Sequence, residues 1–504
     1  MQRALRDILA ALEEHRLLKE KPNGCDDLVI AQITHDSREV LPGTLFACKG
    51  LAFKDEYLFE AVRRGAVCYL SETYIEAADV PAVLVTDIRR AMAAVAIAFT
   101  GGAYKRLKLT GLTGTKGKTT TTYFLRNILD EACGQPTGVL STVEVYTGGG
   151  STQAHLTTPE PFDLHRHFAD AVDHGLEYLT MEVSSQAYLL DRVWDMTFPL
   201  GIFLNISEDH IGPLEHPDFE NYLACKLEFI RNCETILVNG GTDEKERVLA
   251  AAASCKKLVT FGMTPDCDLF ADNIRRSGDG FLFDVHDAGK TSTFAISMLG
   301  RFNVENALAA VAAARHWGIG DEVITKGLAR TSVLGRMNVF CKDGVTVIVD
   351  YAHNRLSFTR LYESLKLDYP GRRLVVVFGC PGGHAQLRRR DLGILAGRHA
   401  DYVYLTAEDP QFEDVAGICG EIASYITPFG VPCTIIEDRS TCIRRAIEAA
   451  KPGDVVVLAA KGEEYYQKVR GEYRYYESDL AIARELLGAP ENELEEVNPR
   501  ASHR

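Results

Sequence analysis

Short apolar runs separated by amphipathic segments recur along most of the chain. In its middle part, apolar runs cover residues 107–109, 178–183, 200–206 and 235–238, and segments with helical periodicity lie between them. Near-continuous apolar runs are typical of parallel strands that are buried on both faces. The pattern therefore predicts a mostly parallel sheet covered by helices on both sides.

The same alternation defines a block on either side of this middle part. The first block, up to about residue 87, has apolar runs at 44–47, 67–70 and 82–85 with a helix near 57–64, which predicts a small α/β unit. In the last block, each apolar run is followed by a helical segment, which predicts a doubly wound, Rossmann-like domain. Its predicted strands cover residues 345–350, 374–378, 402–405, 434–436 and 455–458.

The chain is therefore predicted to be an α/β protein of three domains, at residues 1–88, 89–339 and 340–504. Three segments stand apart from the alternation of strands and helices. Residues 1–18 have the pattern of a charged amphipathic helix, and residues 146–153, with three consecutive glycines, that of a hairpin tip. The acidic end at residues 491–504 is expected to be a frayed tail.

Composition narrows the class of protein. A chain of 504 residues is too long for one hydrophobic core, and 46% hydrophobic with 25% charged residues is ordinary for a globular protein. The net charge of -15 argues against nonspecific nucleic-acid binding, which requires basic surfaces. No signal-like segment or bilayer-length apolar stretch occurs, so we expect a cytoplasmic protein without membrane insertion. The 13 cysteines include no C-x-x-C pair and are interpreted as small buried residues.

The strongest chemical signal lies at residues 111–120, which read Gly-Leu-Thr-Gly-Thr-Lys-Gly-Lys-Thr-Thr after an apolar run. A Gly-Lys-Thr string can arise by chance in a turn, but here a predicted strand precedes it and a helical segment follows. This order predicts the phosphate-binding loop of a central P-loop ATPase-like domain, with Lys118 on the terminal phosphates and Thr119 on magnesium. The ATP-binding residues of the loop are Gly114, Thr115, Gly117, Lys118, Thr119 and Thr120.

Further polar segments follow the loop in a recognisable order. They are Thr157-Thr158-Pro159, Met181-Glu182-Val183-Ser184, Asn205-Ile206-Ser207-Glu208-Asp209-His210, Cys225-Lys226, Asn303-Val304-Glu305-Asn306, Gly335-Arg336 and Asp350-Tyr351-Ala352-His353-Asn354. With the loop, this succession resembles the Mur ligase family from about residue 33 to about residue 485, and within it the members that add the third amino acid. The family's loop usually has Asn where this chain has Lys116.

The resemblance implies an ATP-dependent ligase that activates a carboxylate as an acyl phosphate and then joins it to an amine. Phosphoryl transfer needs positioning and charge neutralisation, which suits the implied catalytic residues Lys118, Glu182, His210 and Lys226. The implied Mg2+ ligands are Thr119, Glu182, His210 and a carbamylated Lys226. Without the resemblance, His210 would be read as a loop histidine and Lys226 as a solvated helix lysine.

The resemblance also assigns residues to the two larger substrates. For ATP it implies Asn303 at the adenine, Arg336 at a phosphate and Asp350 at the ribose. Asn303 and Asp350 could also simply cap the helices that follow them, which is compatible with these roles. For UDP-N-acetylmuramoyl-L-alanyl-D-glutamate it implies Ser37, Arg38, Thr157, Thr158, Ser184 and Arg192. The family's usual Asp-Gly pair after the uridine segment is replaced here by Lys54-Asp55-Glu56.

Two departures bear on the amino acid that is added. Members that add meso-diaminopimelate carry Asp-Asn-Pro-Arg, whereas this chain has Glu408-Asp409-Pro410-Gln411 and so lacks the arginine for the distal carboxylate. Because a buried carboxylate without a partner is costly, we favour L-lysine, or another diamine such as ornithine, with Asp409 and Glu464 at its ammonium group. The family's Gly-Lys-Gly-His-Glu is here Ala460-Lys461-Gly462-Glu463-Glu464, with Glu463 in place of histidine.

Three other interpretations stay open from the sequence. The first is the same chemistry with meso-diaminopimelate or another amino acid. The second is another acceptor, as in folylpolyglutamate or cyanophycin-type ligases, and the third is a non-catalytic nucleotide-binding paralogue. We expect a monomer that binds the UDP-muramoyl dipeptide and an amino acid but no nucleic acid.

Overall fold

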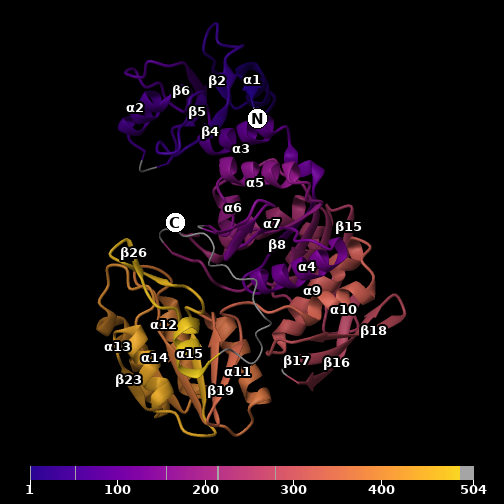
Figure 1. The fold of residues 1–504 in the computed structure, drawn as a ribbon, viewed down its shortest axis with the longest axis vertical. Coiled ribbons are helices and arrows are strands. Elements are labelled where there is room, and N and C mark those ends of the chain that lie inside the picture. The colour runs from indigo at the N-terminus through magenta and orange to yellow at the C-terminus, as the bar shows by residue number, and fades with distance from the viewer. Residues whose placement is uncertain (1, 51–52, 155, 213–214, 279, 489–504) are drawn as a thin grey trace.

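The computed structural model describes residues 2–50, 53–154, 156–212, 215–278 and 280–488, so the predicted tail at 491–504 lies outside it. Three layered α/β bodies follow one another in chain order (Figure 1). The N-terminal body lies at one end of the long axis, and the C-terminal body lies beside the far end of the central one. The predicted α/β class is confirmed.

The N-terminal sheet has the strand order β2-β7-β6-β5-β4, in which only β2 runs antiparallel. Its predicted strands are confirmed, but the helix predicted over residues 1–18 is shorter because both of its ends pair with other strands. The elements are β1 Arg3–Ala4, α1 Leu5–Glu14, β2 Leu18–Glu20, β3 Val29–Ile30, β4 Gln32–Thr34, β5 Thr44–Ala47, α2 Asp55–Arg64, β6 Ala66–Ser71, β7 Ala82–Val85 and α3 Ile88–Thr100.

Helix α3 lies across the expected domain boundary at residue 88. Its buried face, which includes Met92, Val95 and Phe99, joins the N-terminal core around Leu5 and Ile8. The helix also packs against α5 of the central body, so it connects the two. Asp87 caps α3 by accepting from the backbone N–H groups of Arg89 and Arg90.

The central sheet has eleven strands in the order β11-β10-β9-β12-β8-β13-β14-β15-β16-β17-β18. The phosphate-loop strand β8 lies between β12 and β13 and runs parallel to both. The elements up to α7 are η1 Ala103–Arg106, β8 Lys108–Thr113, α4 Lys118–Cys133, β9 Gly138–Leu140, β10 Glu144–Tyr146, β11 Ser151–Gln153, α5 Pro161–Asp173, β12 Tyr178–Glu182, α6 Ser185–Leu189, β13 Phe198–Phe203 and α7 Phe219–Arg231. The predicted hairpin tip is confirmed, since Tyr146 pairs with Ser151.

Beyond β15, the sheet continues into an antiparallel meander that the apolar pattern did not predict. Strand β16 carries exposed polar residues along most of its length, so it lacks the apolar run of a buried strand. The elements after α7 are β14 Cys233–Asn239, α8 Lys245–Ala252, β15 Lys257–Gly262, β16 Leu269–Ser277, β17 Gly280–Asp287, β18 Lys290–Ile296, α9 Phe302–His316 and α10 Asp321–Ala329. Helix α9 packs against α4, and its residues, many of them alanines, are buried on almost every side of the helix.

The C-terminal sheet has the order β19-β20-β24-β21-β22-β23, with only β19 antiparallel. Strand β19 begins at Asn338 and Leu334 packs on the C-terminal core, so the segment around Arg336 belongs to this domain and the domain starts before the expected boundary at residue 340. All five predicted strands form, but β24 leads into a β-hairpin before the last helix. The elements are β19 Asn338–Lys342, β20 Val345–Asp350, α11 Arg355–Asp368, β21 Leu374–Phe378, α12 Leu387–His399, β22 Tyr402–Leu405, α13 Val415–Ile426, η2 Thr427–Phe429, β23 Cys433–Ile435, α14 Arg439–Glu448, β24 Val455–Ala459, β25 Tyr466–Val469, β26 Glu472–Tyr475 and α15 Asp479–Leu487.

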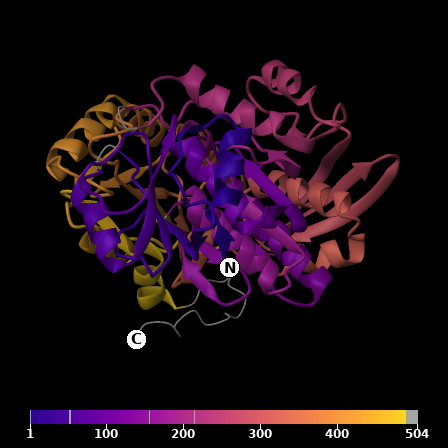
Figure 2. The same cartoon turned by 90° about the horizontal axis from the view of Figure 1, so that it is seen from above.

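Seen from above, the three bodies overlap along the long axis (Figure 2). One hydrophobic cluster includes residues of both the central and the C-terminal body, among them Ile128, Leu308, Met337 and Phe358. Within the described residues, none of the helices has the length and apolar character needed to cross a membrane. All thirteen cysteines are free, and Cys341 is the exposed one among them, which agrees broadly with their interpretation as small packing residues.

Candidate active site

The phosphate loop follows β8 and is held by the segment after β13. Gly114 and Gly117 have φ values of 159° and 88°. A Cβ atom at Gly117 would lie 2.4 Å from the side-chain oxygen of Asn306, so glycine is required there for close packing against α9. The Asn205 side chain accepts from the Lys116 N–H at 2.8 Å and donates to the Lys116 carbonyl at 2.9 Å, which clamps the loop.

Lys118 and Lys226 meet at one carbonyl of this loop. Lys118 Nζ donates to the Gly114 carbonyl at 2.9 Å, and Lys226 Nζ donates to the same oxygen at 3.0 Å and to Thr113 Oγ1 at 3.3 Å. Lys226 is 2% exposed and forms no ion pair with any described residue. Burial, with the nearby Lys118 cation, holds the pKa of Lys226 well below its ordinary value, so the neutral amine is favoured.

Glu182 is a buried carboxylate at the end of β12, next to the phosphate loop. It is 0% exposed, and its oxygens accept from the N–H and hydroxyl of Thr142 at 3.2 and 3.0 Å. No described cation forms an ion pair with it, although a buried carboxylate normally needs one. This arrangement fits a bound metal ion, because carboxylate oxygen is the ligand that Mg2+ prefers.

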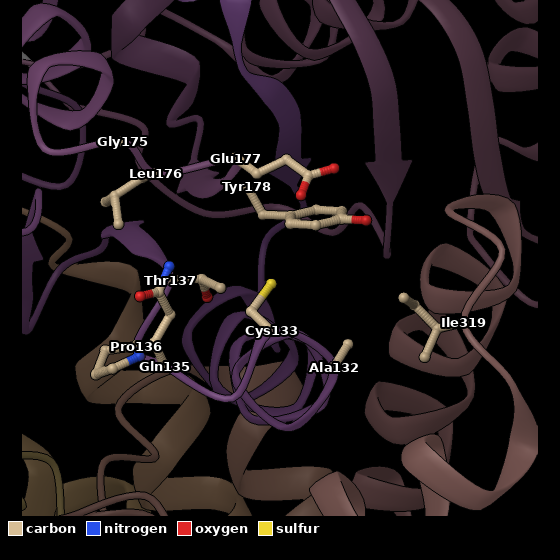
Figure 3. A pocket seen from close by; sticks show the side chains of 10 residues that line it. All are labelled: Ala132, Cys133, Gln135, Pro136, Thr137, Gly175, Leu176, Glu177, Tyr178 and Ile319. Atoms are coloured by element: carbon tan, nitrogen blue, oxygen red, sulfur yellow. The ribbon is translucent and has the colours of Figure 1, made fainter.

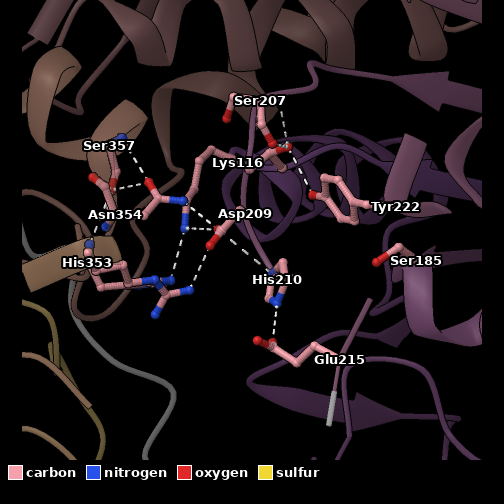
Figure 4. Close-up of polar contacts among 12 residues, drawn as sticks. Lys116, Ser185, Ser207, Asp209, His210, Glu215, Tyr222, His353, Asn354 and Ser357 are labelled. Atoms are coloured by element: carbon pink, nitrogen blue, oxygen red, sulfur yellow. Dashed lines mark hydrogen bonds and ion pairs between the residues drawn. The ribbon is translucent and has the colours of Figure 1, made fainter. Parts of the chain in front are cut away.

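His210 lies in the loop after β13 with a φ of 57°. Its ring nitrogen Nδ1 contacts Glu215 Oε1 at 2.9 Å (Figure 4). No group of three or more His, Cys, Asp or Glu suited to a metal occurs in the described part of the chain. The structure therefore does not bring His210 and Glu182 together with a third ligand of these types, and the role of His210 stays a prediction.

The residues predicted to contact ATP come from α9 and from the C-terminal domain. Asn303 donates to the Leu299 carbonyl at 2.7 Å and accepts from Asn306 at 3.0 Å, and Arg336 stacks 4.0 Å from the centre of the Tyr351 ring. Asp350 accepts from the N–H groups of Met337 and Ala352, and burial raises its pKa.

The alternative that Asn303 and Asp350 are helix caps is wrong. Arg301 stands at the N-cap of α9, and Asn303 lies inside that helix. Asn354, four residues after Asp350, caps α11 in a capping box with Ser357. The ATP roles of Asn303 and Asp350 therefore do not compete with capping.

Asp209 joins the central and C-terminal domains at this site (Figure 4). It is 7% exposed, and its carboxylate accepts from Arg388 at 2.8 Å and from the Asn354 side chain. Lys116 Nζ lies 3.6 Å from the same carboxylate and 2.9 Å from His353 Nε2. The charges of Arg388 and Lys116 hold the pKa of Asp209 well below its ordinary value.

The residues assigned to the UDP-sugar peptide form a second network beside Glu182. Thr158 Oγ1 donates to the Glu182 carbonyl at 3.0 Å and accepts from the Ser184 N–H at 3.0 Å, and Thr157 Oγ1 lies 3.1 Å from Thr142 Oγ1. Arg192 donates to Glu160 at 2.9 Å and to the Thr158 carbonyl at 3.1 Å. These four assigned residues therefore surround one strand end.

Ser37 and Arg38 stand apart from that network, on the N-terminal domain. Arg38 is exposed and pairs with Asp36, whose pKa it lowers to about 2. The two domains meet nearby, where Lys49 forms an ion pair with Glu160. Glu160 thus lies between Lys49 and Arg192.

The two carboxylates assigned to the added amino acid are bridged by a lysine of this chain. Lys461, 1% exposed, lies 2.9 Å from Asp409 Oδ1 and 2.5 Å from Glu464 Oε2, and these charges raise its pKa against the effect of burial. Tyr351 also donates to Glu464 at 2.6 Å. The cluster of Asp409, Glu464 and Lys461 therefore carries a net charge of about -1, which suits one further ammonium group.

A small cavity elsewhere in the central domain is not part of this site. It lies between the end of α4 and the start of β12 and is lined by Cys133, Thr137, Glu177 and Tyr178 among others (Figure 3). The phosphate loop is at the opposite end of both elements, so this cavity does not serve the nucleotide.

Sequence reasoning missed several residues that organise the site. Asp209 lies within the polar segment Asn205–His210, and Glu160 directly follows the segment Thr157-Thr158-Pro159. A carboxylate that follows a buried strand beside a phosphate loop is a sequence feature from which a role in the site can be predicted. Lys49 and Arg388 have no such local signal, because their partners lie in distant segments. Lys461 lies within the Ala460–Glu464 motif, but its pairing with Asp409 joins segments that are far apart in the sequence.

Comparisons with known proteins agree with this geometry. The sequence matches the Mur ligase middle domain over residues 112–314 and the Mur ligase glutamate ligase domain over residues 335–462. It is 40% identical over 466 residues to the UDP-N-acetylmuramoyl-L-alanyl-D-glutamate--L-lysine ligase of Streptococcus suis, covering 92% of this chain and 94% of that protein. It is 39% identical over 502 residues to the enzyme of the same name from Enterococcus faecalis, covering 96% and 98%.

Solved structures show the same fold at lower identity. A UDP-N-acetylmuramoyl-L-alanyl-D-glutamate--2,6-diaminopimelate ligase superposes with a TM-score of 0.65 at 24% identity, covering 96% of this chain and 98% of that one. MurF from Acinetobacter baumannii superposes with a TM-score of 0.66 at 21% identity, covering 93% and 96%.

Proposed function

The chain belongs to the Mur ligase family, and from this premise we propose that it is an ATP-dependent ligase that joins L-lysine to UDP-N-acetylmuramoyl-L-alanyl-D-glutamate in peptidoglycan precursor synthesis. The observation that carries the proposal is the convergence of Lys118 and Lys226 on Gly114, with the unpaired buried carboxylate of Glu182 nearby. A phosphate loop with buried cations and a metal-type carboxylate suits phosphoryl transfer to a carboxylate.

In the proposed reaction, the D-glutamyl carboxylate attacks the γ-phosphorus of ATP, which forms an acyl phosphate and releases ADP. The amine of lysine then attacks the acyl carbon, so that the amide bond forms, phosphate leaves and the amine loses a proton. Lys118 and the loop N–H groups hold the phosphates, and Arg336 adds a guanidinium from the C-terminal domain. The site therefore works mainly by positioning and charge neutralisation.

The residues of this chain also fit the magnesium ion and the lysine carbamate that the family implies. When bound, magnesium would neutralise phosphate charge, and Glu182 and Thr119 would hold it, with His210 and a carbamylated Lys226 as further ligands. The Lys226 carbamate would form by addition of carbon dioxide to the neutral amine, and burial favours that neutral form. Among the described residues, Glu182 is a buried carboxylate without an ion pair and Lys226 a buried amine without a counter-ion, and both observations support these assignments.

The choice of lysine rests on the charges near Asp409. The cluster of Asp409, Glu464 and Lys461 offers one net negative charge to the side-chain ammonium. Gln411 supplies no cation for a distal carboxylate, which disfavours diaminopimelate. Relatives about 40% identical are named L-lysine ligases.

The remaining partners follow from the same proposal. The UDP-sugar peptide would lie along Thr157, Thr158, Ser184 and Arg192 and reach Ser37 and Arg38 on the N-terminal domain. We place the reaction in the cytoplasm, where ATP and nucleotide-linked precursors are available, and expect the enzyme to act as a monomer.

The test is phosphate release by the purified protein with ATP, Mg2+ and the UDP-muramoyl dipeptide across a panel of amino acids. We expect lysine to stimulate release, ornithine to do so more weakly and meso-diaminopimelate to have little effect. If no amino acid stimulated release, the proposed function would be wrong. Preference for diaminopimelate over lysine would overturn the specificity alone.

A further inference from the structure

Lys116, inside the phosphate loop, has no role in the reaction as proposed above. Its backbone is clamped on both sides by Asn205, so the direction of its side chain is well defined. The side chain leaves the central domain and reaches His353 Nε2 at 2.9 Å, in the loop between β20 and α11 of the C-terminal domain (Figure 4). The phosphate loop therefore contacts the other domain directly.

The protonation state of His353 suits this contact. Burial holds the pKa of His353 well below its ordinary value, so the ring is neutral. Its Nδ1 lies 2.8 Å from the Tyr351 carbonyl and must donate to it, which leaves the lone pair of Nε2 to accept from Lys116. His353 is thereby oriented by its own domain to receive the lysine.

Asp209 of the central domain takes part in the same contact between the two domains. Its carboxylate lies 3.6 Å from Lys116 Nζ and accepts from Arg388 on α12 and from Asn354 at the N-cap of α11. One central-domain carboxylate thus holds the start of two C-terminal helices together with the phosphate-loop lysine. We name Lys116, Asp209, His353, Asn354 and Arg388 the interdomain clasp.

The clasp is not a simple ion pair, since one carboxylate faces both Lys116 and Arg388. The pKa of Lys116 falls to about 7, mainly because the amine is buried; Asp209 raises this pKa, whereas Arg388 and Lys118 lower it. A buried group with this balance of charges contributes little net stability, but it specifies geometry. Such a contact is suited to domain docking that must be made and broken in each catalytic cycle.

We propose that Lys116 is a positioning residue that docks the C-terminal domain on the phosphate loop, and so brings Arg336 and Asp350 to the nucleotide. This inference rests on the proposed function, because it gives docking a purpose in phosphoryl transfer. In this role Lys116 acts through His353 and Asp209, and Lys118 remains the lysine that holds phosphate.

The experiment compares the full-length wild type with Lys116→Met, Lys116→Arg and the control Lys108→Met. Lys108 starts the same strand β8 but pairs with Glu177 at its far end. Hydrogen exchange of the backbone around residues 353–358 reports docking without turnover. Steady-state kinetics and equilibrium ADP binding are measured on the same proteins.

We expect Lys116→Met to speed exchange in residues 353–358 and to lower kcat, each by about tenfold or more, within the usual range for coupling between sites. ADP affinity should stay within about threefold, because the side chain does not hold phosphate. Lys116→Arg, which keeps a cation, should retain most of the protection, and Lys108→Met should match the wild type. In a double-mutant cycle, adding His353→Leu to Lys116→Met should have little further effect, because both remove one contact.

Unchanged exchange and kcat in Lys116→Met would overturn the proposal. A loss of ADP affinity as large as the loss of kcat would also overturn it, because Lys116 would then be a phosphate ligand. Additive effects of Lys116→Met and His353→Leu would contradict their coupling. An inactive wild type would reject the proposed function, whereas the exchange comparison would still decide whether Lys116 docks the domain.

Discussion

At Lys226, burial and neighbouring cations act in the same direction. The amine is enclosed by the Tyr222 ring at 4.9 Å and by the loop oxygens at Thr113 and Gly114. A permanent cation at this position would lack a counter-ion among the described residues, and Lys118 is close enough to repel it. These surroundings favour the neutral amine that carbamylation requires.

We therefore expect Lys226→Ala to abolish phosphate release and Lys226→Arg not to restore it, since a guanidinium stays charged and cannot form the carbamate. Depleting bicarbonate should lower the activity of the wild type, and adding it back should restore it. Phosphate release at saturating substrate concentrations measures the activity of both variants and the bicarbonate dependence of the wild type. Full activity of either variant would contradict the role of this lysine.

Glu463 replaces the histidine that the family usually has beside Glu464. Its pKa rises to about 7, mainly because the carboxyl group is buried; Arg336 lowers this pKa, and Glu464 raises it. Glu463 is therefore mostly neutral at pH 6 and charged at pH 8. A second negative charge next to the ammonium site strengthens binding of a cationic amino acid.

The KM for lysine should thus fall as the pH rises from 6 to 8, by about threefold to tenfold. Glu463→Gln, which cannot ionise, should give a flatter profile, and initial rates at varied lysine concentration measure the difference. A wild-type KM that does not change over this range, or an equal change in the variant, would show that Glu463 does not influence the site.

Sequence could predict the residues whose chemistry is written in a local motif. The phosphate loop and Glu182 are of this kind, whereas Lys226 was singled out only through the family resemblance; the structure brings the three segments together. The bridge of Lys461 between Asp409 and Glu464 was not predictable, because it depends on the packing of segments that are 52 residues apart. The same holds for Lys49 and Glu160, which are 111 residues apart.

At the scale of elements, buried parallel strands were predictable because most of their residues are apolar. The strands of the C-terminal sheet illustrate this, since β24 is Val-Val-Val-Leu-Ala and fully buried. In the meander β16–β18, β16 is largely exposed, and β17 alternates the buried Phe281, Phe283 and Val285 with half-buried residues, so neither has the continuous apolar run used for the prediction. In the hairpin β25–β26, β26 is exposed and β25 is half-buried. Their pairing comes from neighbouring strands rather than from an apolar run.

Helix α14 carries an ion pair that positions two loops of the amino-acid site. Arg439 and Asp479 are both 0% exposed, with Arg439 Nη2 2.6 Å from Asp479 Oδ2. Arg439 also donates to the carbonyls of Ala407 and Ala459, which precede Glu408 and Ala460. The pair therefore connects the ends of β22 and β24 to the last helix.

Arg439→Met should destabilise the protein by about 3 to 5 kcal/mol, because it leaves the buried Asp479 carboxylate without its cation, with the Tyr476 hydroxyl still donating to it. It should also raise the KM for lysine, since both loops lose a hydrogen bond. Arg444→Met is the matched control on the same helix, because Arg444 pairs with Glu477 and Glu485 at the surface. That change should cost less than about 1 kcal/mol.

Denaturant unfolding of the two variants, followed by probes of the C-terminal domain, gives the comparison. Equal and small losses of stability for both would mean that the buried pair contributes no more than the surface one. An unchanged KM for lysine in Arg439→Met would contradict its effect on the loops.

At the scale of the whole molecule, two sets of polar contacts between domains hold the three domains around one site. Lys49 and Glu160 join the N-terminal and central domains, and Asp209 with Arg388 joins the central and C-terminal domains. The three-block pattern predicted the domains, but it carried no information on how they meet. These contacts decide which strand ends face one another, and thereby where the acceptor, ATP and lysine would converge.

The most direct test of the account follows an oxygen atom through the reaction. UDP-N-acetylmuramoyl-L-alanyl-D-glutamate labelled with 18O in its glutamyl carboxylate is incubated with the protein, ATP, Mg2+ and lysine. The proposed acyl phosphate route predicts ADP, a product heavier by one lysyl residue, and one 18O atom in the released phosphate, because an acyl phosphate passes that oxygen to phosphorus. Formation of the lysyl product with unlabelled phosphate, or no product with lysine, would contradict it.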